Sequence, residues 1–240
     1  MITESLTYLR ESEDVFKTVL IGGLLVLFGV FIVPTITLVG YLMRVLRRTS
    51  GGDDVAPTIE VDELVEMTKE GVPGFVVAFV YGIVPGIVAA VLFGGALFAF
   101  VLGGSADSGG LVGLGFGGLL LAGFVSIVLS LAAAYVIPAA LANVAEKGTI
   151  GAGFDFGVLR QVLFSGTYAT GWAMGLVVVI LGAIVLSVLS AVTFGIGGVL
   201  GVFVQFYTIV AAYYIIGQTW EELRIDEPVD GSEPAEQAAV

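Results

Sequence analysis

Four long stretches without a charged residue constrain the fold of this chain more than any other feature. They cover residues 18–43, 71–106, 108–145 and 161–220 of the 240. A helix needs about 20 predominantly apolar residues to cross the roughly 30 Å hydrocarbon core of a bilayer. Each of the first three stretches exceeds that length, and the fourth is long enough for two crossings. We therefore interpret the chain as an integral membrane protein.

Helices are the expected element, because in lipid every backbone polar group must find its partner within the spanning structure. The sequence predicts an all-α, multi-pass helical bundle with about five crossings, and it allows six. The N-terminal segment, residues 1–17, is acidic, and an interfacial helix is one interpretation of it. The C-terminal segment, residues 218–240, is acidic and is expected to be disordered. Between them lies the membrane domain, residues 18–217, with crossings at 18–44, 72–102, 111–142, 171–193 and 198–217.

The stretch FIVPTITLVGYLMRVLRR, residues 31–48, ends the first crossing and decides on which side the N-terminus lies. With five crossings, Arg10 and Lys17 fall on one side and the other seven basic residues fall on the opposite side. Because basic residues collect in the cytoplasm, this predicts an outside N-terminus and a cytoplasmic C-terminus in the cell membrane. If Pro34 instead breaks the first crossing into a re-entrant hairpin, residues 1–17 move to the cytoplasmic side.

Two connections contain amphipathic segments, TIEVDELVEMTKEG and FDFGVLRQVLF. In the first, Val61, Leu64, Val65 and Thr68 follow the spacing of one helix face; the second has a similar apolar stripe beside Arg160. A surface helix at the level of the lipid headgroups fits both segments. A helix that packs on the protein's own cytoplasmic ends fits them equally well.

The composition excludes several classes of site. The chain has no cysteine and no histidine, and no carboxylate lies within a span. Disulfides, thiolate ligands and the commonest acid–base group are therefore absent, and we expect no catalytic residue, no cofactor and no metal site. No basic patch suits nucleic acid. The net charge of −12 with only nine basic residues is typical of a salt-rich cytoplasm, although an acidic protein of an ordinary cytoplasm remains an alternative.

Small residues recur at every fourth position in the second and third predicted crossings, and the fourth has Gly171 and Gly175, then Ala183, Ser187 and Ala191. Such ridges let helix backbones approach closely in lipid, where little hydrophobic force drives helices together. The sequence therefore predicts that the second and third crossings form a tight antiparallel pair, with dimerisation as a second use, and that Gly86→Leu loosens the fold. The ridges are Ala78, Gly82, Gly86, Ala90 and Gly94 in the second crossing and Gly118, Ala122, Ser126, Ser130 and Ala134 in the third.

Polar groups at membrane depth are few. Gln205 with Thr208 one turn on can mark a polar pathway or can form an ordinary hydrogen bond between helices. The prolines of the spans, Pro34, Pro85 and Pro138, can expose backbone carbonyls to a solute, as in transporters. The favoured interpretation is a plain kink whose freed groups bond to neighbouring helices.

Three arginines, Arg44, Arg47 and Arg48, end the first crossing. We expect them to hold this end on the cytoplasmic side and to reach anionic lipid headgroups. A specific lipid or phosphate site is the alternative function, although three arginines fall short of the usual four to eight.

The order of these features resembles a known family. The segments EDVFKTVLIGG, IVPTITLVGYLMRVLR, GGDDVAP, ELVEMTKEG and VYGIVPGIV are similar to an uncharacterised multi-pass family, found mainly in haloarchaea and other archaea, called domain of unknown function four-zero-one-three. The resemblance covers most of residues 10–220 and implies a membrane protein in a salt-loving organism, with no assigned activity. It is carried by Gly22, Gly23, Pro34, Gly40, Tyr41, Arg44, Arg47, Pro57, Gly71, Tyr81 and Pro85.

Three functions remain open at this point. The first is a non-enzymatic protein that packs with partners or organises lipid, with the bilayer, a second copy or another membrane protein as its partner. The second is a small-solute transporter or permease subunit built on the kinked spans. A membrane enzyme ranks last, because no acid, base or metal ligand is evident. A polar cavity that reaches Gln205 would favour the transporter.

Overall fold

The computed structural model describes residues 2–12, 14–194 and 196–225, which contain no strand. The all-α, multi-pass class is confirmed: four helices, α4, α5, α7 and α8, are long and apolar enough to cross a membrane. The number of such helices in the described part is therefore four rather than five. The helices are α1 (Ile2–Tyr8), α2 (Val15–Leu27), α3 (Ile32–Thr49), α4 (Leu64–Ser105), α5 (Gly109–Lys147), α6 (Phe156–Leu163), α7 (Gly166–Val192) and α8 (Ile196–Ile225), with 3-10 turns η1 (Leu9–Glu11) and η2 (Ile150–Phe154).

The predicted first crossing is not one helix. The chain breaks between α2 and α3 at residues 28–31, and Lys17 at the start of α2 forms an ion pair with Glu60, beyond the end of α3. The two outer ends of this helical hairpin therefore lie together, as the re-entrant alternative predicts. Pro34 lies in the first turn of α3, where a helix does not use the missing N–H. The residue four positions earlier, Val30, lies within the break, as expected where a proline prevents one helix from continuing into the next.

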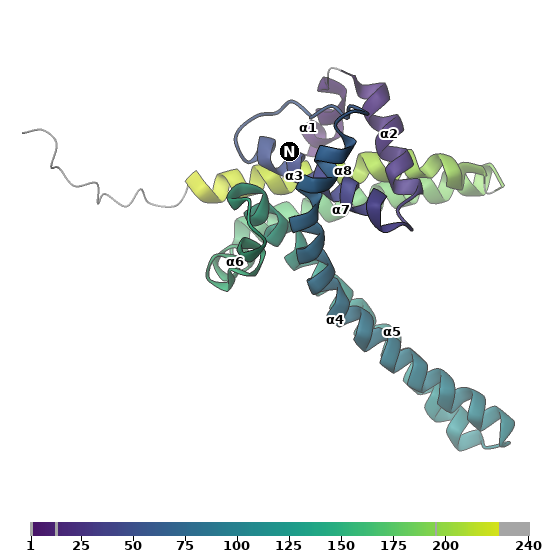
Figure 1. Cartoon of the computed structure of the whole chain (residues 1–240). Coiled ribbons are helices and arrows are strands. Elements are labelled where there is room, and N and C mark those ends of the chain that lie inside the picture. The colour runs from purple at the N-terminus through teal and green to yellow at the C-terminus, as the bar shows by residue number, and fades with distance from the viewer. Residues whose placement is uncertain (1, 13, 195, 226–240) are drawn as a thin grey trace, which may run out of the picture.

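The membrane-spanning part consists of two antiparallel hairpins, α4–α5 and α7–α8. The hairpins meet at one end of the molecule and diverge towards their turns (Figure 1). At about 1.5 Å per residue, the 42 residues of α4 extend over about 63 Å. This length exceeds the thickness of the hydrocarbon core by about a factor of two.

Side-chain caps explain where several helices begin. The carboxylate of Asp14 accepts a hydrogen bond from the backbone N–H of Lys17 (3.2 Å), and the hydroxyl of Ser165 accepts one from Tyr168 (3.1 Å). Such caps satisfy N–H groups that have no partner within the helix. The helix α5 ends just before Gly148, which adopts the left-handed conformation (φ 69°) that ends many helices.

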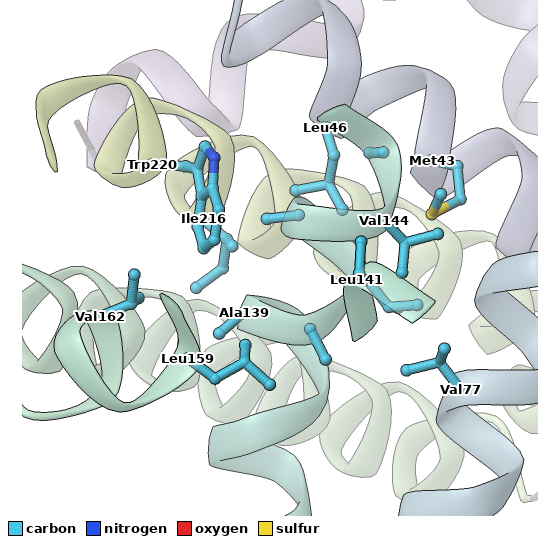
Figure 2. Packing of buried hydrophobic residues seen from close by; sticks show 14 of the residues in the cluster. Met43, Leu46, Val77, Ala139, Leu141, Val144, Leu159, Val162, Ile216 and Trp220 are labelled. Carbon is cyan, nitrogen blue, oxygen red and sulfur yellow. The ribbon is translucent and has the colours of Figure 1, made fainter. Parts of the chain in front are cut away.

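The core lies at the end where the hairpins meet. Buried side chains of α3, α4, α5, α6, α7 and α8 pack together there, and Leu141 and Val144 of α5 lie among those of α3, α4, α6 and α8 (Figure 2). Away from this end the α4–α5 hairpin is the more exposed of the two. Only 6% of the most apolar window of α4 is buried, against 44% of that of α8. Lipid rather than protein is the natural environment of such apolar surface.

The backbones of α3 and α4 are in direct contact at two glycines. A Cβ atom added at Gly40 would overlap the carbonyl oxygen of Met67 and lie 3.1 Å from the backbone N of Gly71. A Cβ atom added at Gly71 would overlap the carbonyl oxygen of Ile36. Only glycine fits at both positions, so this crossing fixes how the α2–α3 hairpin joins the rest.

Two predicted boundaries differ from the structure. The segment TIEVDELVEMTKEG is not a separate interfacial helix, because from Leu64 onward it forms the first turns of α4. The helix α8 continues to Ile225, so residues 218–225 of the predicted tail are helical. The remaining residues of that tail, 226–240, lie outside the described part of the chain.

Candidate functional site

The arginines at the end of α3 form the most charged region of the structure. The guanidinium of Arg44 donates to both carboxylate oxygens of Glu70 (3.0 Å each) and to Glu63 (2.6 Å). Its side chain is only 16% exposed. The hydrogen bonds to Glu70, and then those to Glu63, raise the pKa of Arg44 above its ordinary value. Arg44 is therefore held inside the protein and is not free to bind a lipid headgroup.

Arg47 and Arg48 are more open. Arg47 donates to the carbonyl of Ala145 (3.3 Å) and Arg48 donates to the carbonyl of Val55 (3.4 Å), and about half of each side chain is exposed. A hollow of about 350 Å³ lies beside them, but its lining includes the carboxylates Glu63 and Glu66. Because carboxylates lie beside the arginines, this hollow does not suit an anion. The arginine side chains instead connect α3 to α4 and α5 through hydrogen bonds.

An apolar crevice lies where the two hairpins separate. It has a volume of about 320 Å³, and none of the described residues that line it is charged. We call it the hairpin crevice. It lies among three of the four candidate spans, at the base of the diverging arms. Its lining residues are Ala134, Ile137, Pro138, Trp172, Gly175, Leu176, Val179, Ala212, Tyr213 and Ile216.

The proline of this crevice creates an attachment between the hairpins. Pro138 has no N–H for the carbonyl of Ala134, four residues earlier in α5. That carbonyl accepts a hydrogen bond from the indole N–H of Trp172 on α7 (2.9 Å). One residue on, the carbonyl of Tyr135 accepts from the hydroxyl of Tyr168, also on α7 (2.7 Å). The freed backbone group is satisfied by a neighbouring helix, as the plain-kink interpretation predicts.

Gln205 and Thr208, the residues of the possible polar pathway, do not meet at a cavity among those described. Gln205 is exposed on α8 and does not line the hairpin crevice. The hydroxyl of Thr208 donates to the carbonyls of Val204 and Gln205 in its own helix (3.0 Å each). Thr208 also packs against Gly182 of α7, so it serves the contact between the two helices of a hairpin.

The small-residue ridge of α4 points away from α5. A Cβ atom added at Gly82, Gly86 or Gly94 would meet no atom within 4 Å, and Ala90 is exposed; Ala78 is half-buried. The structure pairs the two helices through another face of α4, which includes Ala96. The contact predicted for this face of α4 is therefore absent among the described residues.

The ridge of α5 is divided. Gly118 faces Ala96 of α4, with 3.0 Å between an added Cβ and the Ala96 Cβ, and Ala122 is buried. Ser126 has a buried hydroxyl without a hydrogen-bond partner among the described residues. Ser130 and Ala134 are exposed. The first half of this ridge therefore lies against α4, and the second half does not.

Small residues also bring the two helices of the α7–α8 hairpin close together. Gly171, Gly175 and Gly182 lie on the buried face of α7, and an added Cβ on the first or the last would overlap a threonine of α8. The sequence shows Gly171 and Gly175 at a four-residue spacing but gives no sign that their partners are on α8 rather than α5. No group of three or more His, Cys, Asp or Glu side chains able to hold a metal ion occurs in residues 2–12, 14–194 and 196–225.

Comparisons with curated proteins and with solved structures give no match. A family model does match, over residues 23–194, and its description is "Protein of unknown function (DUF4013)". The match covers the arginine cluster and the α5 and α7 residues of the hairpin crevice, but it ends before the α8 residues of the crevice, Ala212, Tyr213 and Ile216. Because it covers well over half of the 240 residues, this chain belongs to the family of proteins of unknown function DUF4013.

Proposed function

We propose that this multi-pass membrane protein is not an enzyme and organises lipid by holding an acyl chain in the hairpin crevice. The observation that carries the proposal is the crevice itself, an apolar hollow of about 320 Å³ among α5, α7 and α8. Ligand sites are typically concave and mostly apolar, with few polar groups. In a bilayer the molecules available to fill such a site from the side are lipids.

The transporter alternative has less support. A solute pathway through a membrane protein needs polar or charged side chains along a cavity. The crevice contains no such charged group, and the predicted polar residue Gln205 lies elsewhere on the surface of α8. The carbonyl freed by Pro138 bonds to Trp172 instead of facing a cavity. These contacts favour lipid over a hydrophilic solute.

Filling the crevice tests the lipid proposal. Val179 lines the crevice and is 39% exposed, so Val179→Phe should fit without disturbing the core and should lower the retention of co-purified lipid roughly tenfold. The measurement is native mass spectrometry of the purified protein released from detergent. Val177→Phe is the matched control, on the same helix at 45% exposure but outside the crevice. Unchanged retention in Val179→Phe, or an equal loss in both variants, contradicts the proposal.

We also propose that the end at which the hairpins meet faces the cytoplasm, with both chain termini on that side. The ends of several helices converge there: Arg47 bonds to Ala145, and Trp220 donates to Glu146 (2.8 Å). The N-terminal helix joins them, because the ring of Tyr8 lies 4.3 Å from that of Tyr214 on α8. Every basic residue of the chain lies outside the two hairpin turns, at residues 104–108 and 193–196. Basic residues are retained in the cytoplasm.

Single cysteines report this orientation cleanly, because the chain has none of its own. A membrane-impermeant maleimide should label Ser105→Cys, at the turn of α4–α5, in intact cells. It should label Thr3→Cys and Glu222→Cys only after the cells are permeabilised. Labelling of Thr3→Cys in intact cells would instead support the outside N-terminus predicted from five crossings.

A salt-rich cytoplasm is a further part of the proposal and is supported by the net charge of −12. Raising KCl from about 0.1 M to about 1 M shortens the screening length from roughly 10 Å to 3 Å and weakens repulsion among the carboxylates. We expect the melting temperature of the detergent-solubilised protein to rise by several degrees. A fall would mean that the ion pairs, which salt weakens, dominate over repulsion.

A further inference from the structure

The short helix α6 lies in the connection between two candidate spans, α5 and α7. Two sets of contacts hold α6 in place: its buried apolar side chains and the cap at its N-terminus. Leu159 and Val162 are buried in the core where the hairpins meet (Figure 2), and the carboxylate of Asp155 accepts backbone N–H bonds from Gly157 (3.2 Å) and Val158 (3.3 Å). Because the chain enters the membrane on both sides of α6, the helix lies near the bilayer surface.

The outward side of α6 carries an unusual stripe. Phe156, Arg160 and Phe164 recur at every fourth position and so lie in a row along the helix and its last turn. Phe156 is 71% exposed and Phe164 is 86% exposed. Two large aromatic side chains in water on one short helix are unfavourable, so a partner with an apolar part is expected to cover them. We call this stripe, with Gly157 and Gln161 beside it, the α6 face.

The cation in the middle of the α6 face has no counter-charge among the residues that the structure describes. Arg160 has no carboxylate oxygen within 4.0 Å in the described part of the chain. Nearby basic residues are paired, Lys147 with Asp155 (3.5 Å) and Arg224 with Glu146 (3.2 Å). A cation without a carboxylate partner in the described part of the chain is notable in a protein with a net charge of −12. It stands beside a hollow of about 520 Å³ lined by Gly157, Arg160, Gln161 and Phe164.

We propose that the α6 face binds the phosphodiester headgroup of an anionic lipid. The guanidinium of Arg160 donates to the phosphate oxygens, a geometry that arginine matches well. Phe156 and Phe164 enter the boundary between headgroups and acyl chains, where amphipathic helices bury their apolar side chains. The inference deepens the proposed lipid-organising function and rests on its membrane setting, but none of its residues lines the hairpin crevice.

A lipid explains the α6 face better than a free phosphate ion. A soluble anion would use Arg160 and the hollow but would leave both phenylalanines in water. A lipid supplies an anionic and an apolar part in the same molecule, in the order in which the bilayer presents them to a helix at its surface. The two ligands make different demands on the phenylalanines, and this difference separates them experimentally.

The first test measures headgroup selectivity by native mass spectrometry. The protein is purified in mixed micelles that contain phosphatidylglycerol and phosphatidylcholine with identical acyl chains. Wild type should retain the anionic lipid in preference, and Arg160→Gln should lower the ratio of retained anionic to zwitterionic lipid about fivefold, the factor expected for one basic residue near an anionic surface. Lys69→Gln removes an exposed charge from α4 and should leave the ratio unchanged.

The outcomes of this test are distinct from those for the crevice. A ratio unaffected by Arg160→Gln, or lowered equally by Lys69→Gln, overturns the α6 proposal, whatever Val179→Phe does to total lipid. The double variant Phe156→Ser/Phe164→Ser should also lower retention of the anionic lipid. Displacement of that lipid by an excess of inorganic phosphate, with the double variant behaving as wild type, would show a soluble-anion site and would also overturn the proposal.

A spin label gives a readout that does not depend on lipid retention. Attached to Phe164→Cys in reconstituted vesicles, the label should collide more often with oxygen, which enters the bilayer, than with a water-soluble nickel complex. Attached to Glu222→Cys, on the exposed side of the end of α8, it should show the opposite preference. If the label at residue 164 collided more often with the nickel complex than with oxygen, as a label in water does, the proposed position of α6 would be overturned.

Discussion

Gly40→Val is expected to prevent the protein from reaching its native fold. The added side chain would overlap the carbonyl oxygen of Met67 and press on the backbone of Gly71. Both obstacles are backbone atoms of a helix, which cannot rotate aside as a flexible side chain can. Overpacking of this kind costs typically 1–3 kcal/mol and occasionally more. We expect a loss at or above about 3 kcal/mol, seen as a large fall in melting temperature in detergent or as failure to purify a monodisperse protein.

The matched control for this prediction is Gly86→Val. Nothing lies within 4 Å of a Cβ atom added at Gly86, so the new side chain would extend into lipid. Glycine is among the weakest helix formers, and its replacement in an exposed helix should leave stability equal or slightly higher. The structure thus reverses the expectation that a large residue at Gly86 loosens the fold. Equal losses in both variants would mean that the contact between α3 and α4 does not limit stability.

Arg44→Met is the second substitution expected to have a large effect. It would leave Glu63 and Glu70 facing a thioether in a region where Glu70 is only 25% exposed. Removal of one partner of a buried ion pair costs about 3–5 kcal/mol, and the partial exposure of both carboxylates reduces this to about 2–3 kcal/mol. Thermal unfolding in detergent measures the loss. Arg44→Lys should recover part of it, because a lysine keeps the charge but cannot reproduce the two-pronged contact with Glu70.

Two further variants show whether this loss comes from an unpaired charge. Arg44→Met combined with Glu70→Gln should be more stable than Arg44→Met alone, because the amide removes the charge that was left without a partner. Arg48→Met should have little effect, since Arg48 is 46% exposed and its nearest carboxylate oxygen, on Asp53, is 3.9 Å away. A loss at Arg48 as large as that at Arg44 would contradict a special role for the pairing with α4.

The long helices could be predicted because their signal is local. The charge-free stretches at residues 71–106, 108–145 and 161–220 became α4, α5, α7 and α8. The first stretch misled for a physical reason: residues 28–31, where the chain turns, are as apolar as the helices on either side. Hydropathy measures whether a segment prefers lipid and does not register a turn within it. The ion pair between Lys17 and Glu60 that brings the hairpin ends together joins residues 43 positions apart, beyond any local pattern.

The helix contacts could be predicted only in kind. A four-residue spacing identifies a close-packing face but not the helix that will cover it, because the rotation of each helix is set by its turns and by the core. The ridge that includes Gly82 therefore faces outward, whereas the isolated glycines Gly40 and Gly71 make the closest crossing of all. Gly40 and Gly71 are both among the residues that carry the family resemblance. In the sequence, nothing else indicated that these two glycines are important. The bond from Arg44 to Glu70 spans 26 positions and could not be foreseen from the sequence.

The attachment at Pro138 has a consequence for how the sequence can drift over evolutionary time. The groups on α5 that hold Trp172 and Tyr168 are backbone carbonyls, which every amino acid supplies. Residue 134 can therefore change identity without loosening the join, so long as its new side chain leaves room for the indole. The proline and the two aromatic donors carry the constraint, and we expect substitutions to concentrate at the acceptor positions rather than at these three.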